Sequence, residues 1–139
     1  MNILIIDGQG GGIGAQLVSA IISNFPSFTI RAVGTNSAAT AAMIKAGAKD
    51  AATGENAVIV GCRNADIIIG PVGIVIADSL LGEITPAMAT AVGQSRGKRF
   101  LIPINQCDNM IVGMPNLPVN KMVMGVIALI KEYDHPNCS

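Results

Sequence analysis

The residues with the clearest chemistry form a glycine-rich run near the N-terminus, Asp7-Gly8-Gln9-Gly10-Gly11-Gly12-Ile13-Gly14. Glycines allow tight turns with positive φ and let the backbone approach a ligand closely. A helix starting at Ile13 would add free N–H groups and a partial positive charge, which together suit an anion such as phosphate. Packing of a helix on a sheet needs one glycine here rather than five, so the run favours ligand binding. Close packing alone remains the alternative explanation.

The run fits two known cofactor loops. Residues 10–15 fit the G-x-G-x-x-A pattern of dinucleotide-binding proteins. Gly8 together with Gly12-Ile13-Gly14 resembles the cofactor loop of short-chain dehydrogenases. That resemblance implies a Tyr-x-x-x-Lys pair, yet the single tyrosine, Tyr133, is followed four positions later by Asn137. A dehydrogenase of that family is therefore disfavoured, while NAD(P) or another nucleotide stays a candidate ligand.

Asp7 complicates a phosphate site at this loop. An ionised carboxylate about 4 Å from a phosphate charge costs roughly 1 kcal/mol in water-like surroundings and ~4 kcal/mol at an effective dielectric constant of 20. The helix N-terminus returns only about 0.3–1 kcal/mol, with ~2 kcal/mol as its upper range. Three arrangements remain open. Asp7 ties down N–H groups of its own loop, it holds a divalent ion that bridges to phosphate, or the ligand carries no phosphate at that place.

The remaining reactive side chains lack partners in the sequence. Cys107 suggests a nucleophile, but the single histidine, His135, lies in a proline-containing tail, and a thiol without a base stays protonated. Glu55 and Glu83 could each serve as a general base, although nothing in the sequence fixes either one, and helix capping explains Glu55 equally well. The acidic residues follow no metal-ligand spacing, so the sequence predicts no metal site.

The elements that must position these residues alternate along the chain. Continuous or alternating apolar runs predict strands over residues 2–6, 28–33, 49–52, 65–69 and 99–104, with 109–113 as one further strand. Helical spacing predicts helices over residues 13–22, 37–46, 53–63, 74–92 and 119–133. Ser37 is expected to cap the second helix, and the fourth is expected to break at Gly82 or restart at Thr85-Pro86.

Strands that alternate with helices require a mostly parallel sheet covered on both faces. The sequence therefore predicts one α/β domain over residues 1–139, with a three-layer Rossmann-like fold. Right-handed crossovers and the glycine-rich first turn favour the strand order 3-2-1-4-5.

In such a sheet the carboxyl ends of all strands meet at one edge, where ligands bind. Each predicted strand exit changes abruptly from apolar to small or polar residues. The candidate ligand-binding residues at the exits are Asp7, Gly8, Gln9, Gly10, Gly11, Gly12, Ile13 and Gly14 after the first strand, Thr35, Asn36 and Ser37 after the second, and Gly70, Pro71, Gly73 and Asn105 after later strands. The second strand ends without the acidic residue that would hold an adenosine ribose.

The amino-acid composition favours some classes of binding partner and disfavours others. Half of the residues are hydrophobic and 13% are charged, against a usual charged share of roughly 25%, so part of the surface is expected to be covered by another copy. A homo-oligomer is predicted, with a dimer as the default, and a compact monomer with an apolar surface as the alternative. Nine basic and nine acidic residues form no block, which disfavours nucleic acid. No apolar run is long enough to span a membrane, and three scattered cysteines fit a reducing cytoplasm.

As a whole, the chain resembles a family of small uncharacterised proteins from clostridium-like bacteria, known as a domain of unknown function. The resemblance rests on residues 6–14, 33–36, 52–57, 67–74, 82–86 and 101–107. It implies a Rossmann-like fold and brings no activity with it. Three functions stay open: a nucleotide-binding or sensing protein, an enzyme acting on a small acidic or phosphorylated metabolite, and a non-catalytic oligomer that recruits a partner.

Overall fold

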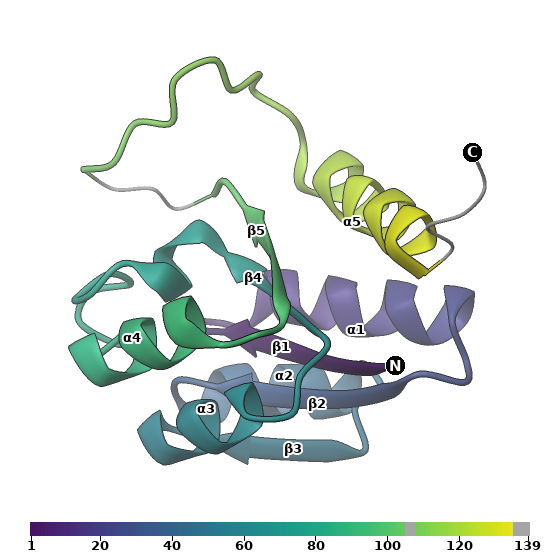
Figure 1. Ribbon diagram of the computed structural model, residues 1–139, viewed down its shortest axis with the longest axis horizontal. Helices are drawn as coiled ribbons and strands as arrows, with labels where there is room; N and C mark the ends of the chain where they lie inside the picture. The colour runs from purple at the N-terminus through teal and green to yellow at the C-terminus, as the bar shows by residue number, and fades with distance from the viewer. Residues whose placement is uncertain (105–107, 135–139) are drawn as a thin grey trace.

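A five-stranded parallel sheet forms the centre of the protein in the computed structural model, which describes residues 1–104 and 108–134 (Figure 1). Its order is β3-β2-β1-β4-β5, which confirms the predicted fold class and strand order. The strands are β1 (Asn2–Asp7), β2 (Thr29–Gly34), β3 (Asp50–Thr53), β4 (Ile67–Pro71) and β5 (Lys98–Ile102). The order reverses at β1, which pairs with β2 on one side and β4 on the other. The loop after β1 therefore lies at the position where folds of this type bind ligands.

Helices cover both faces of the sheet (Figure 1). They are α1 (Gly12–Asn24), α2 (Ser37–Lys45), α3 (Glu55–Cys62), α4 (Pro86–Gln94) and α5 (Val119–Asp134). One core joins the sheet to α1, α2 and α5, and a second joins it to α3 and α4. Among the described residues, no helix has both the length and the apolar composition needed to cross a membrane.

The apolar strands supply both cores because successive side chains of a strand point to opposite faces. In β1, Ile3 and Ile5 belong to the core beneath α1 and α5, while Leu4 and Ile6 belong to the core beneath α3 and α4. All four side chains are at most 1% exposed. This is why β1 reads as an uninterrupted apolar run rather than an alternating one.

The single long helix predicted over residues 74–92 is wrong. A 3-10 turn, η1 (Val72–Val75), follows β4, and α4 begins only at Pro86. Between them Asp78, Leu80 and Leu81 have φ values of 66°, 55° and 56°, and Gly82 has a φ of 86°, a run of backbone conformations that no α-helix contains. The alternative restart at Thr85-Pro86 is correct, since the Thr85 hydroxyl accepts the Met88 N–H at 3.2 Å and Pro86 is the first helical residue.

Two smaller expectations also need correction. Residues 109–113 form turn and coil rather than a strand. Asn36, not Ser37, caps α2, because the Asn36 side-chain oxygen accepts the Ala39 N–H at 2.8 Å and Ser37 is already helical. Asn105 and Cys107 lie outside the described residues.

Candidate functional site

The glycine-rich run forms the glycine loop, residues 7–14, which links β1 to the start of α1. Gly11 is the N-cap of α1, with a φ of 72°, and its N–H donates to the Gly8 carbonyl at 3.0 Å. A Cβ added at Gly11 would lie 2.8 Å from the Cα of Ala39 in α2, so this glycine serves both the turn and the close approach of two helices. One added at Gly14 would lie 2.6 Å from the Met43 sulfur. Packing therefore explains these two glycines.

Two other glycines of the loop face open space. A Cβ added at Gly10 or Gly12 would meet none of the described residues within 4 Å, and neither glycine has a positive φ. Neither packing nor backbone conformation therefore requires glycine at these two positions. The close approach of another molecule to the backbone would account for glycine at both positions.

Asp7 is buried at the base of the glycine loop, with 6% of its surface exposed. Its Oδ1 accepts the Gly8 N–H at 2.8 Å, and its Oδ2 accepts the Gly14 N–H at 2.6 Å. Burial raises the pKa of Asp7, the two N–H groups act against that rise, and the nearby charge of Glu83 adds to it. Of the three arrangements considered for Asp7, the structure has the first, in which the carboxyl ties down its own loop.

A cleft of about 590 Å³ runs along the outer side of the glycine loop. One wall is the loop from Asp7 to Ile13, with Gln16 beside it. The opposite wall comes from residues close to the carboxyl end of β5 and the start of α5: Pro103, Ile104, Asn116, Leu117, Val119 and Met122. We call this the loop cleft.

Three backbone N–H groups at the loop cleft have no hydrogen-bond partner within residues 1–104 and 108–134. They belong to Gly10, Gly12 and Ile13. The last two stand at the N-terminus of α1, where the helix dipole leaves a partial positive charge. Unpaired N–H groups at a helix start form a ready site for an anion.

On the other side of the loop, Glu83 joins three segments in an arrangement we call the Glu83 bridge. Its Oε2 accepts the Gln9 N–H at 2.8 Å and the Thr35 hydroxyl at 2.7 Å, and its Oε1 accepts the Asn36 amide at 2.9 Å. Partial burial alone would raise the pKa of Glu83, but the bonds from Thr35, Gln9 and Asn36 outweigh it and lower the pKa. Glu83 is therefore held as an anion.

The structure brings only some of the predicted site residues to the loop cleft. Thr35 and Asn36 contact Glu83 instead, and Ser37 is the first residue of α2. Gly70 and Pro71 are buried at the end of β4, where a Cβ added at Gly70 would collide with the Ile6 carbonyl oxygen. Gly73 lies in η1, and its carbonyl accepts the Ser79 hydroxyl.

Sequence reasoning placed the exit of the last strand at this edge of the sheet but missed the part of the outer wall that comes from Asn116, Leu117, Val119 and Met122. Its residues stand more than 85 positions after the glycine loop, and their types are those of any apolar surface. The available signal was topological: β5 ends at the same edge as β1, so the chain leaving it must pass near the loop. The position of Glu83 had no such signal, because it depends on the irregular loop before α4.

Two other reactive side chains within the described residues lie away from the loop cleft, Glu55 in a contact between helices and Cys62 in the core. Glu55 is exposed and its Oε1 accepts the Thr85 hydroxyl at 2.6 Å, a contact that joins the starts of α3 and α4. Burial raises the pKa of the Cys62 thiol to about 11, so this cysteine stays protonated near neutral pH. Within the described ranges, His, Cys, Asp and Glu side chains form no group of three suited to a metal ion.

Comparison with known proteins gives a distant structural match and a family. A solved structure, the dodecameric FMN-dependent UbiX-like decarboxylase from Escherichia coli O157:H7, is 19% identical in sequence. The match covers 93% of this chain and 76% of that one, with a TM-score of 0.44. Among curated proteins none matches the chain. A family model matches residues 2–135, in agreement with the resemblance found in the sequence, and the chain belongs to this family, described as a domain of unknown function, DUF3842.

Proposed function

We propose that this protein binds a phosphate-bearing small molecule of the nucleotide type in the loop cleft. One observation carries the proposal: the N–H groups of Gly10, Gly12 and Ile13 line the cleft without a partner among the described residues. Phosphate oxygens are the acceptors that such a helix start favours. The absence of a Cβ at Gly10 and Gly12 would let a ligand come close to the backbone.

The outer wall of the cleft suits the rest of such a ligand. Ile104, Leu117 and Met122 offer apolar surface for a planar ring, and the amides of Asn116 and Gln16 offer hydrogen bonds. A cleft of about 590 Å³, lined by polar groups as well as apolar side chains, has the size of sites for small molecules. Binding is the function these features support.

The charges near the loop are compatible with an anion in the cleft. Asp7 directs both carboxyl oxygens to N–H groups of its own loop, those of Gly8 and Gly14. The Glu83 carboxylate is engaged with Thr35 and Asn36 on the opposite side of the loop. The repulsion expected from the sequence for a carboxylate directly beside the phosphate is therefore reduced.

Calorimetric titration with AMP, FMN, ATP, S-adenosylmethionine and NAD tests this proposal. Gly12→Asp places a negative charge at the expected phosphate position, at a helix start where an acidic residue does not harm folding. We expect at least one of these compounds to bind the wild type, and Gly12→Asp to weaken that binding by about a hundredfold. Gly125→Asp, which adds the same charge at an exposed position of α5, is the matched control. No binding by the wild type, or equal binding by Gly12→Asp, would contradict the proposal.

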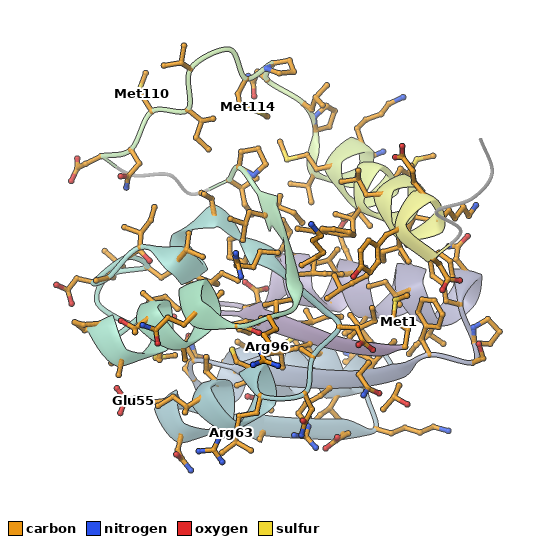
Figure 2. All side chains as sticks on the ribbon, viewed as in Figure 1. Met1, Glu55, Arg63, Arg96, Met110 and Met114 are labelled. Atoms are coloured by element: carbon orange, nitrogen blue, oxygen red, sulfur yellow. The ribbon has the colours of Figure 1, made fainter. Side chains whose placement is uncertain are left out.

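We also propose that the protein self-associates through residues 108–118. These residues extend away from the sheet (Figure 1), and Met110, labelled in Figure 2, and Val112 are 89% and 98% exposed. Apolar side chains grouped on a projecting segment are typical of an interface. Sedimentation equilibrium should give a dimer or larger assembly that dissociates in the double variant Met110→Ser, Val112→Ser. A monomeric wild type at high concentration would overturn this proposal.

A further inference from the structure

We infer that Glu83 determines the class of ligand: by filling the crevice between the ends of β1 and β2, it restricts the site to mononucleotide-sized ligands and excludes dinucleotides. The inference rests on the proposed function, since it restricts the class of ligand that the same glycine loop is proposed to bind. Its basis is the Glu83 bridge, which lies where proteins of this fold place the ribose of a dinucleotide's adenosine half, at the end of β2.

The Glu83 carboxylate leaves no room in that crevice. Asp7 and Gly34 are register partners at the ends of β1 and β2, and Glu83 is bonded to Gln9, two residues after Asp7, and to Thr35, the residue after Gly34. Even a Cβ added at Gly8 would lie 2.5 Å from the Glu83 Oε2 and 2.7 Å from the Thr35 hydroxyl. A ribose at this place would need the volume that the carboxylate occupies.

The hydrogen-bonding groups that line the crevice are also bonded to one another. The Thr35 hydroxyl donates to Glu83, and the Asn36 amide nitrogen donates to Glu83 and to the Gln9 carbonyl at 3.0 Å. The carboxylate itself accepts three bonds out of about four positions, so it cannot receive both hydroxyls of a ribose diol. The crevice is therefore filled and satisfied by the chain itself.

The loop that carries Glu83 is anchored on both sides of it. Leu80 and Ile84 are 2% and 1% exposed in the core beneath α3 and α4. The Asp78 N–H donates to the Ile84 carbonyl at 2.7 Å, and the Ile84 N–H donates to the Ser79 carbonyl at 3.2 Å. These contacts fix the backbone on both sides of Glu83, and a ligand that rotated its side chain away would break the bonds of the carboxylate to Gln9, Thr35 and Asn36. On the cleft side, by contrast, Gly10 and Gly12 are open, so the ligand's phosphate and single ring system belong there.

Calorimetric titration of the full chain with AMP, FMN and NAD tests the inference. We expect the wild type to bind AMP or FMN at least about tenfold more tightly than NAD. Glu83→Ala empties the crevice and should raise the affinity for NAD by about tenfold or more, with AMP or FMN binding as the check that the loop cleft is formed. Glu83→Gln keeps the volume and should still exclude NAD.

Glu55→Ala is the matched control because Glu55 also accepts a threonine hydroxyl, and its removal changes the charge equally without emptying the crevice. It should behave as the wild type does toward NAD. If Glu83→Ala fails to fold, as judged by circular dichroism, Glu83→Asp shortens the side chain by one methylene and should raise NAD affinity by about threefold.

The outcomes separate the two proposals. Equal binding of NAD and mononucleotides by the wild type would overturn the inference alone. So would NAD binding that Glu83→Ala abolishes, since Glu83 would then be a ribose ligand. If neither the wild type nor any variant bound a nucleotide, the proposed function would fail, and the inference with it.

Discussion

The two sides of the glycine loop present hydrogen-bond donors in opposite states. On the β2 side, the Gln9 N–H, the Thr35 hydroxyl and the Asn36 amide all donate to the carboxylate of Glu83. On the β5 side, the N–H groups of Gly12 and Ile13 face the loop cleft with no partner among the described residues. The hydrogen-bond donors on the β2 side of the glycine loop are therefore paired within the protein, whereas those on the β5 side are unpaired among the described residues.

This difference divides the glycines into two groups with different physical roles. Gly8, Gly11 and Gly14 allow close contacts within the protein, because a Cβ at any of them would lie under 3 Å from a neighbouring atom. A Cβ at Gly10 or Gly12 would meet no atom of the described residues within 4 Å. The glycine-rich pattern thus combines glycines that folding requires with glycines that it does not, and only the surroundings of each glycine separate the two.

The largest expected loss of stability comes from Gly11→Ala, a substitution at one of the three glycines that have close contacts within the protein. The new Cβ would lie 2.8 Å from the backbone of Ala39 and would force a non-glycine residue to a φ of 72°. We expect the free energy of unfolding to fall by about 3 kcal/mol, the sum of left-handed strain and overpacking. Urea denaturation measures it, and a loss below about 1 kcal/mol would show that α1 and α2 separate easily.

Gly8→Ala should disturb the β2 side of the glycine loop, where the Glu83 bridge lies. Its Cβ would lie 2.5 Å from the Glu83 Oε2 and 2.9 Å from the Leu80 side chain, so the Glu83 bridge must shift. We expect a loss of about 2 kcal/mol in urea denaturation, since overpacking typically costs 1–3 kcal/mol. Gly10→Ala is the control from the open side, where nothing lies within 4 Å. Equal losses for the two variants would remove the distinction between the sides.

Glu83→Gln should weaken the same bridge in a pH-dependent way. Glutamine presents an NH₂ group to donors that all need an acceptor, so we expect a loss of about 1 kcal/mol at neutral pH. The folded state lowers the Glu83 pKa, so the wild type's advantage is fully present above the ordinary value of 4.5 and disappears as the pH falls through the folded-state pKa. Urea denaturation of both proteins at neutral and acidic pH measures this. An advantage that stays constant into acid would mean that charge has no part in the bridge.

The smallest effect is expected at Gly12, and it has the opposite sign. Gly12 is the first residue of α1, it is exposed, and it has open space around its Cα. Replacing it by alanine should raise stability by about 0.5 kcal/mol, because the unfolded chain loses freedom that the helix does not need. A clear destabilisation, seen as a lower midpoint of thermal unfolding, would show that the open side is less open than its geometry indicates.

Much of the fold could be predicted because it follows from local pattern. The apolar run of β1 and the helical spacing of α1 and α5 gave the elements, and the handedness of crossovers gave their order. The prediction failed between η1 and α4, where apolar residues at helical spacing hide a run of positive φ values. There the buried side chains of Leu80 and Ile84 stabilise an irregular loop against the local preference for a helix.

The sequence by itself determined that a glycine loop joins the first strand to the first helix, because glycine spacing and apolar periodicity act within a few residues. It also determined that the second strand ends without an acidic residue. Only the tertiary structure decided that Glu83 supplies a carboxylate at that same place, and that Asn116, Leu117, Val119 and Met122 help to form the opposite wall of the cleft. Both depend on where distant segments pack against each other, and local preferences hold no information about that.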